Sequence, residues 1–173
     1  IVDTDFSSAA STGLHSSSGN ALPTLREYRS AQDTIDFDDE VYGSSISTMA
    51  YAMTYVINDS GGPLATDVAL ASDDGIEVLV QGTVVHSNSI CRVSGTPGTI
   101  QDRSPVTLAV GRSLVMVTIF HSGGDWQFRL RFEQAGTQTP LGPASGLSAT
   151  FSAGNIGPVR SLSGLRINES LIG

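Results

Sequence analysis

Lysine is absent from this chain of 173 residues, and cysteine occurs only once. No apolar run approaches the roughly 18 residues that a membrane-spanning helix requires. The nine basic residues are therefore all Arg, and the net charge is −8. A chain this acidic is poorly suited to nucleic acid or to an anionic membrane surface, because both repel negative charge. We expect neither as a partner, and we expect no insertion into a membrane.

The single cysteine, Cys91, excludes an internal disulfide, and we expect it to be a small buried side chain rather than a nucleophile. The chain begins Ile1-Val2-Asp3, without Met or a signal peptide, so we expect a processed or excised product. Its length favours one domain with terminal extensions. The content of 39% hydrophobic and 15% charged residues is typical of a globular protein with a real core.

The charges are unevenly placed along the chain. Residues 1–80 carry 13 of the 17 acids and two Arg, a balance of −11, whereas residues 81–173 carry four acids and seven Arg, a balance of +3. If the two halves formed different faces, copies of the protein would attract one another head to tail. A sandwich that interleaves the halves would cancel this asymmetry, and the sequence leaves both possibilities open.

Helical periodicity is almost absent, and short strands with Gly-rich turns take its place. The clearest strand is WQFRLRFE, in which Trp126, Phe128, Leu130 and Phe132 alternate with polar residues. We predict an all-β fold, an antiparallel jelly-roll β-sandwich with Ser/Gly-rich terminal extensions. The residues expected to face its core are Trp126, Phe128, Leu130, Phe132, Val115, Val117, Ile119, Val78 and Val80.

The turn signals place the remaining strands. Three strands, at 68–71, 76–80 and 83–86, are expected to form a meander around Asp73-Asp74-Gly75 and Gln81-Gly82-Thr83. Strands at 105–110 and 113–120 flank Gly111-Arg112, which is typical of a two-residue hairpin. Further strands are expected at 49–57 and 147–151.

Composition divides the chain into four parts. We expect a Ser/Gly-rich N-terminal arm at 1–22, a sandwich core at 23–134, a Gly/Pro-rich connection at 135–158 and a C-terminal strand segment at 159–173.

Four blocks of the chain appear in an order that is familiar from one kind of domain. They read AYAMTYV, ALASDDGIEVLVQGTVVHSNSICR, QDRSPVTLAVGRSLVMVTIF and GGDWQFRLRF. Over roughly residues 26–133 the chain resembles the galactose-binding-like, carbohydrate-binding-like β-sandwich modules of secreted bacterial proteins. Its SDDG turn is similar to that of the protective-antigen-type sugar-binding domain. The chain departs from the usual pattern at Leu79, where relatives carry an aromatic residue, and at Gln81-Gly82, where they carry Asn-Gly.

This resemblance implies an accessory binding module without catalysis, located outside the cell or at its surface. In the protective-antigen-type relatives the paired Asp residues bind calcium, and the ion can then coordinate sugar hydroxyls. Carried over, this implies Ca²⁺ at Asp73 and Asp74 and a polysaccharide or glycan as partner.

The chemistry of the Asp pair allows two interpretations. Ca²⁺ takes six to eight oxygen ligands, so Asp73 and Asp74 would need help from backbone carbonyls or another acidic segment. In the alternative, the Asp side chains cap backbone amides in a turn before Gly75. The acidic cluster Asp36, Asp38, Asp39 and Glu40 is a weaker metal candidate, since such runs are commonly solvated loops.

The sequence contains few residues or motifs suited to catalysis. The histidines His15, His86 and His121 are far apart without metal-ligand spacing, and we expect single exposed side chains. No G-x-S-x-G elbow or Gly-rich phosphate loop is present in the sequence. We therefore expect that the protein is not an enzyme.

Sugar binding usually requires aromatic side chains that stack on pyranose faces. Trp126 lies among the apolar alternate positions of its strand. Tyr51 and Tyr55 lie at alternate positions of the same parity within the strand expected at 49–57. Tyr28 and Tyr42 remain as candidate glycan contacts, which is a thin supply.

The C-terminal segment suggests a different role. Leu165, Ile167 and Leu171 share one parity and follow a Gly-rich connection, which suits a strand added to a neighbouring sheet. The N-terminal arm, with Val2 and Phe6, would lie along a surface or in a seam between copies. The first hypothesis is therefore an extracellular structural subunit that self-associates into a filament or matrix by terminal strand exchange. The alternative is a calcium-dependent carbohydrate-binding module of a larger protein.

Overall fold

A computed structural model describes residues 33–37 and 48–150 of the chain. Within these ranges the chain forms nine strands and one short 3-10 helix. They are β1 (Ile35–Asp36), β2 (Thr48–Asn58), β3 (Leu64–Asp73), β4 (Ile76–Val80), β5 (Thr83–Asn88), β6 (Asp102–Leu108), β7 (Gly111–His121), β8 (Gln127–Gln134), η3 (Pro143–Ser145) and β9 (Leu147–Thr150).

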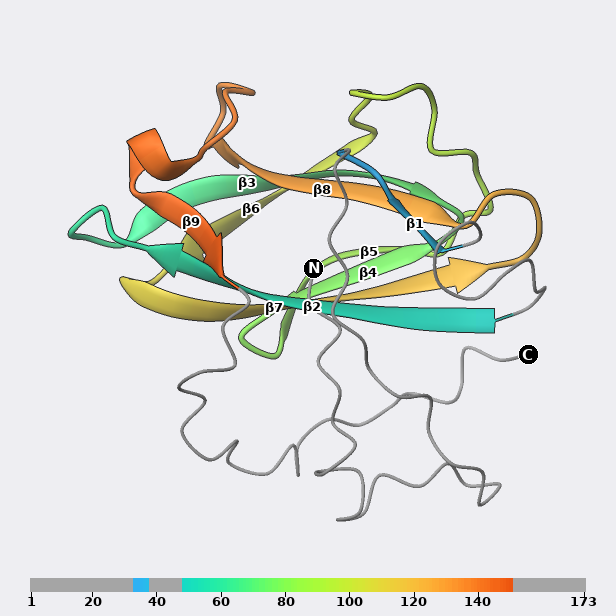
Figure 1. Cartoon of the computed structure of the whole chain (residues 1–173), viewed down its shortest axis with the longest axis horizontal. Helices are drawn as coiled ribbons and strands as arrows, with labels where there is room; N and C mark the ends of the chain where they lie inside the picture. The colour runs from blue at the N-terminus through green and yellow to red at the C-terminus, as the bar shows by residue number, and fades with distance from the viewer. Residues whose placement is uncertain (1–32, 38–47, 151–173) are drawn as a thin grey trace, which may run out of the picture.

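The strands form two antiparallel sheets packed face to face (Figure 1). The four-stranded sheet has the order β1-β8-β3-β6, and the five-stranded sheet has the order β5-β4-β7-β2-β9. This confirms the predicted all-β sandwich. No helix in the described ranges is long and apolar enough to cross a membrane.

The core lies between the sheets and follows from the period-2 alternation of the strands. Phe128 is fully buried from one sheet, and Ile119 and Val78 are fully buried from the other. Eight of the nine predicted core residues are buried, and the ninth, Leu130, packs against the core while remaining partly exposed.

The turn between β4 and β5 is the predicted tight hairpin. Gln81 and Gly82 have φ values of 51° and 78°, the two positive angles of a type I′ turn, and Val80 pairs with Thr83 across it. A bulge between Val78 and Leu79 shifts the register of this hairpin.

Two other predicted turns prove to be crossings between sheets. Asp73–Gly75 joins β3 in the four-stranded sheet to β4 in the five-stranded sheet, so the expected meander is wrong at this point. Gly111 likewise begins β7 after β6 has ended in the other sheet, so the hairpin at Gly111-Arg112 is also wrong. Local turn chemistry cannot distinguish a hairpin from a crossing, because both need a sharp bend between apolar runs.

Each sheet draws strands from both halves of the sequence. In the five-stranded sheet β4 pairs with β7, and in the four-stranded sheet β3 lies between β8 and β6. The described strands therefore interleave the acidic and basic halves, the second of the two arrangements that the charge pattern allowed.

Candidate functional site

The Asp73–Asp74 turn lies where β3 ends and the chain crosses to the other sheet. Both residues are only 4% exposed, and the peptide bond between them is cis. Gly75 is required here because a Cβ at this position would lie 3.0 Å from the carbonyl oxygen of Asn88. The turn is held in place by Phe120, which donates its N–H to Gly75 and accepts from Asp74 N–H.

The Asp74 carboxylate joins two distant loops. Its Oδ1 accepts hydrogen bonds from Cys91 Sγ at 2.9 Å and Arg92 N at 3.2 Å. Its Oδ2 accepts from both the N–H and the hydroxyl of Ser122, each at 2.7 Å. Burial opposes ionisation, but these donors hold the pKa of Asp74 below its usual value. The side chain acts as an ionised cross-link between loops.

The pKa of Asp73 is shifted in the opposite direction. Burial raises its pKa to about 6, and the neighbouring charge of Asp74 adds to the increase. A backbone hydrogen bond from Ser94 and the proximity of His121 oppose the shift, while Asp125 reinforces it. Asp73 is thus a buried carboxyl that is costly to ionise.

The carboxylates of Asp73 and Asp74 are too few to hold a calcium ion by themselves. A carboxylate has about four lone-pair positions, and four protein donors already bind Asp74. No group of three or more His, Cys, Asp or Glu side chains placed to hold a metal occurs within residues 33–37 and 48–150. Calcium binding at Asp73 and Asp74 therefore stays a prediction, and the donors around Asp74 favour the alternative of a hydrogen-bonded turn.

The weaker metal candidate is only partly described. Asp36 lies on β1 and is half-buried, whereas Asp38, Asp39 and Glu40 lie outside the described residues.

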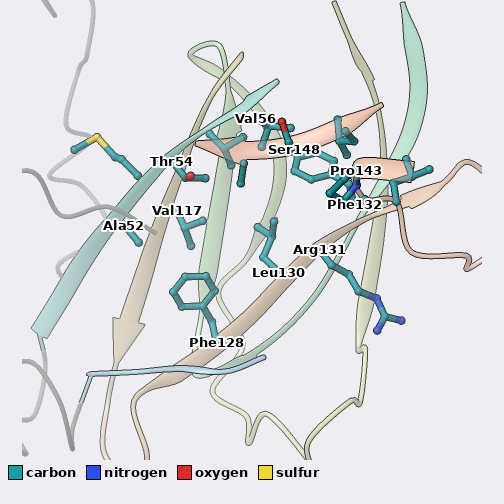
Figure 2. Close-up of a pocket in the computed structure, with 16 residues that line it drawn as sticks. Ala52, Thr54, Val56, Val117, Phe128, Leu130, Arg131, Phe132, Pro143 and Ser148 are labelled. Atoms are coloured by element: carbon teal, nitrogen blue, oxygen red, sulfur yellow. The ribbon is translucent and has the colours of Figure 1, made fainter. Parts of the chain in front are cut away.

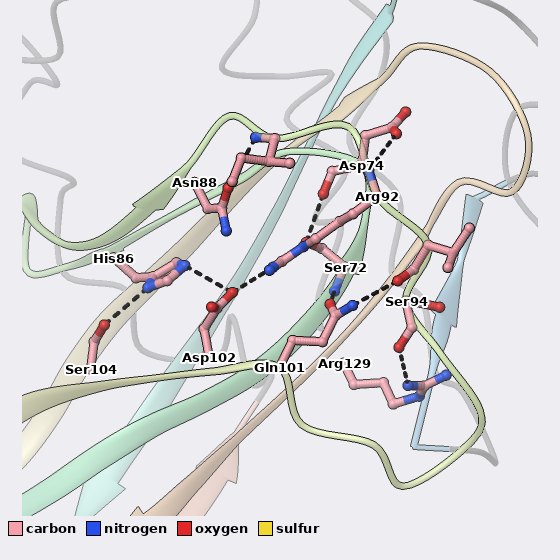
Figure 3. Close-up of polar contacts among 12 residues, drawn as sticks. Ser72, Asp74, His86, Asn88, Arg92, Ser94, Gln101, Asp102, Ser104 and Arg129 are labelled. Atoms are coloured by element: carbon pink, nitrogen blue, oxygen red, sulfur yellow. Dashed lines mark hydrogen bonds and ion pairs between the residues drawn. The ribbon is translucent and has the colours of Figure 1, made fainter.

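The loop that follows β5 is held by a polar network that reaches Asp74 (Figure 3). Arg92 binds Asp102 Oδ2 at 2.5 Å and the hydroxyl of Ser72 at 2.9 Å. Gln101 accepts a hydrogen bond from Ser72 N–H at 2.9 Å and donates to the Val93 carbonyl at 2.6 Å.

His86 connects the two sheets along the side formed by edge strands β5 and β6. Its Nδ1 lies 2.9 Å from Ser104 Oγ, and its Nε2 lies 3.5 Å from Asp102 Oδ2. The order Ser-His-Asp is that of a hydrolase, but Arg92 already binds this Asp and the imidazole is only 10% exposed. Burial lowers the pKa of His86, so the ring is neutral at pH 7. The arrangement closes one side of the sandwich.

Several exposure predictions are wrong. Cys91 is exposed rather than buried, because it lies on the loop that Asp74 anchors. His121 is 3% exposed and stacks on Trp126 at 5.2 Å, and His86 is also largely covered, so neither is a free surface histidine. His15 lies outside the described residues.

Of the aromatic residues, Trp126 is in the core as expected, at 2% exposure. Tyr28 and Tyr42, the candidate glycan contacts, lie outside the described residues. Tyr51 and Tyr55 point out of the sandwich rather than into it. Tyr51 is 39% exposed, and Arg112 lies over the ring of Tyr55 at 5.1 Å.

The outer face of the five-stranded sheet is largely apolar, although Glu77, Thr118 and Arg112 also lie on it. Its outward positions alternate with buried core residues such as Ala52 and Val117, and the register places Met53 between Tyr51 and Tyr55 and opposite Met116. The large apolar side chains on this face are Met49, Tyr51, Met53, Tyr55, Ile57, Leu79, Leu114, Met116 and Phe120. A sheet with one solvated face normally carries polar residues there, so this face is typical of a sheet covered on both sides.

The outer face of the four-stranded sheet, in contrast, carries charged side chains. Glu133 is fully buried there between two arginines, with Arg103 Nε at 2.8 Å and Arg131 Nη2 at 2.6 Å. Burial opposes ionisation, but the Arg103 and Arg131 guanidinium groups hold the pKa of Glu133 below its usual value.

On the side of the sandwich away from His86, the described strands leave part of one edge unpaired. Strand β9 pairs only with residues Tyr55–Asn58 of β2. Over Thr48–Thr54, β2 pairs with β7 on one edge and with no described strand on the other. A cleft of about 440 Å³ lies between the sheets at the end of this edge, lined by Ala52–Thr54 and Val56 of β2, by Phe128 and Leu130 of β8, and by Leu147–Ala149 of β9 (Figure 2).

Sequence reasoning missed most residues that hold the site. Ser122 reaches Asp74 from 48 positions away, and Arg129 reaches the Ser94 carbonyl from 35, and no local motif marks such pairs. The apolar outer face did carry a signal, because MAYAMTYVI is apolar at both parities. The predicted assembly residues Leu165, Ile167, Leu171, Val2 and Phe6 lie outside the described residues.

No family model matches the chain, and no curated protein matches it. Among solved structures the chain is similar to the crystal structure of the PA14 domain of the MpAFP antifreeze protein. The TM-score is 0.48, with 16% sequence identity over 62% of this chain and 54% of that one. The chain thus spans about half the length of this neighbour, and we argue function from the chain's own residues.

Proposed function

We propose that this protein is a non-catalytic structural subunit that self-associates outside the cell or at its surface, in a filament- or matrix-like assembly formed by terminal strand exchange. The single observation that carries the proposal concerns strand β2. Its edge lacks a described partner over Thr48–Thr54, and both of its faces are apolar.

The edge of β2 over Thr48–Thr54, which pairs with no described strand, favours the addition of another strand. Unpaired N–H and C=O groups along a strand are a template for an added strand, and proteins that do not use such an edge usually shield it with charge, Pro or bulges. The segment Thr48–Thr54 contains neither Pro nor a charged residue, and its pairing with β7 is regular throughout. It therefore has none of these protective features.

The apolar outer face supports association independently of the edge. Around Met53, the side chains of Tyr51, Tyr55 and Met116 form an apolar surface of the kind that marks an interaction site on a soluble protein; Tyr51 is 39% exposed and the other three are partly exposed. Because the other outer face carries the charged cluster around Glu133, only one face of the sandwich has this character among the described residues.

The proposal is tested on the full chain by analytical sedimentation and by electron microscopy of the unmodified protein at neutral pH. We expect concentration-dependent assembly, and a chain lacking residues 159–173 should remain folded but sediment as a monomer. A full chain that stays monomeric at high concentration would exclude the proposal. That result would favour the alternative, a calcium-dependent carbohydrate-binding module. Glycan binding on an array, measured with and without a chelator, would then test the alternative.

A further inference from the structure

The cleft beside β2 lies between the two sheets at the edge of the core. Its walls are inward-facing apolar side chains of both sheets, including Ala52 and Val117 on one side and Phe128 and Leu130 on the other (Figure 2). Protein interiors are close-packed, and an apolar cavity of about 150 Å³ already holds a benzene molecule. A volume of about 440 Å³ is roughly three times larger, enough for several apolar side chains.

We propose that this cleft receives the C-terminal segment of a second copy of the chain, residues 165–171, as a strand added beside Thr48–Thr54 of β2. The inference rests on the proposed function and specifies its acceptor site. The face of the segment that carries Leu165, Ile167 and Leu171 would turn toward the cleft, with Glu169 of the same parity placed near Arg131, which also lines the cleft, while the backbone of the segment pairs with the edge of β2 over Thr48–Thr54.

The place where the described chain ends identifies the occupant. β9 ends at Thr150 opposite Tyr55, at the border of the unpaired edge, and 23 residues follow. A direct extension of β9 meets Gly154, Gly157 and Pro158, which weaken a strand, and Pro also lacks the N–H that pairing requires. The next alternating apolar pattern begins at Leu165.

The connection is long enough for exchange between copies. Residues 151–164 span at most roughly 50 Å when extended, which exceeds the width of a sandwich of this size.

The cleft also contains a polar atom that needs a partner, because Thr54 Oγ1 is buried without a hydrogen bond to any described group. An added strand would bring backbone donors and acceptors to it.

Disulfide trapping between two different copies tests the occupant directly. One full-length copy carries Leu130→Cys, the other carries Ile167→Cys, and both carry Cys91→Ser so that no native thiol interferes. After mixing and mild oxidation we expect a covalent dimer of the two copies in non-reducing electrophoresis, in at least tenfold excess over a control mixture with Val84→Cys replacing Leu130→Cys. Val84 is exposed on the opposite edge strand.

A chain carrying both Leu130→Cys and Ile167→Cys separates the alternatives. If it closes an internal disulfide and mixed copies form none, the protein's own segment fills the cleft and the inference is wrong. If the full chain assembles but neither experiment gives a disulfide, the acceptor site is wrong while the proposed function stands. If the full chain is monomeric, the proposed function fails as well.

Variants whose side chains fill the cleft allow a second test, in which assembly is measured. Ala52→Phe should occupy the cleft and weaken assembly at least tenfold in sedimentation, whereas Val84→Phe should not. Ala52→Leu is the milder variant if Ala52→Phe lacks a cooperative thermal transition. Folded Ala52 variants that assemble like the unmodified chain would overturn the inference.

Discussion

Ser122 donates both its backbone N–H and its hydroxyl to one oxygen of Asp74, each at 2.7 Å, and thereby ties the loop after β7 to the crossing between the sheets. Hydrogen bonds to a charged group are each worth about 1.5–3 kcal/mol, and removing the acceptor leaves these part-buried donors without their carboxylate partner. Asp74 is therefore the residue on which two loops depend.

Substituting Asp74→Asn should destabilise the fold by at least about 2 kcal/mol, because the amide cannot accept from all four donors. Chemical denaturation at pH 7 measures the loss. The pKa of Asp74 is lowered in the folded state, so its contribution is present above the usual pKa of 3.8 and is lost as pH falls below it. Asp59→Asn, at an exposed position, is the control and should change little. Equal stability of the two variants would contradict this role.

Asp73→Asn should have the opposite effect. The pKa of Asp73 is raised from 3.8 to about 6, so ionisation at neutral pH costs folding free energy. That cost is absent below pH 4 and grows as pH rises from about 4 through 6. We expect the variant to be more stable by about 2 kcal/mol at pH 7.5 and unchanged at pH 4, since each pKa unit corresponds to about 1.4 kcal/mol. A variant less stable at pH 7.5 would indicate that the charge has a bound partner.

Calcium would be such a partner. Because hydrogen bonds already occupy the Asp74 carboxylate, we expect the thermal midpoint of the full chain to be the same in a chelator and in millimolar Ca²⁺. Binding to the folded state alone would raise stability by RT ln(1 + [L]/Kd), or about 2.7 kcal/mol at a hundredfold excess over Kd. A gain in stability of that size on adding Ca²⁺, if Asp73→Asn abolished it, would establish the ion site. The site would then require ligands beyond the described residues.

How far the sequence predicts this molecule depends on the range of the interactions. Alternation within a strand is local, so the buried positions of Trp126 and Phe128 were predicted correctly. Sheet membership is not local: the same turn residues at Asp73–Gly75 and Gly111 suit a hairpin or a crossing, and the partners β7 and β6 decide which forms.

The site was predicted less completely than the fold. The two aspartates stand out in the sequence because like charges are adjacent, yet their different pKa values depend on Ser122, Cys91 and Ser94, which no spacing rule connects to them. Tyr51 and Tyr55 were assigned to the interior because they share a parity, but Ala50 and Ala52 occupy that interior. In a strand apolar on both faces, parity alone cannot tell which face is inside.

Glu133 provides a test on the polar face of the sandwich. Glu133→Gln leaves Arg103 and Arg131 without their shared carboxylate, and we expect a loss of roughly 2 kcal/mol. This is below the 3–5 kcal/mol typical of fully buried pairs, because the two Arg side chains are 33% and 39% exposed. The pKa of Glu133 is lowered, so the contribution is present above its usual pKa of 4.5 and disappears as pH falls. Glu77→Gln on β4 is the control, and an equal effect in both variants would refute the assignment.

The apolar outer face provides the last prediction. Met53 lies at the centre of this face, between the two tyrosines and opposite Met116, so Met53→Glu would place a charge in the middle of any contact made there. If the face packs against another copy, the variant should keep a cooperative thermal transition while its assembly in sedimentation weakens at least tenfold. Ala65→Glu, exposed on the outer face of the four-stranded sheet, carries the same added charge and should assemble normally. A variant that assembles normally but melts at a lower temperature would show that the chain covers this face with its own residues. That result would leave the edge of β2 as the only support for association.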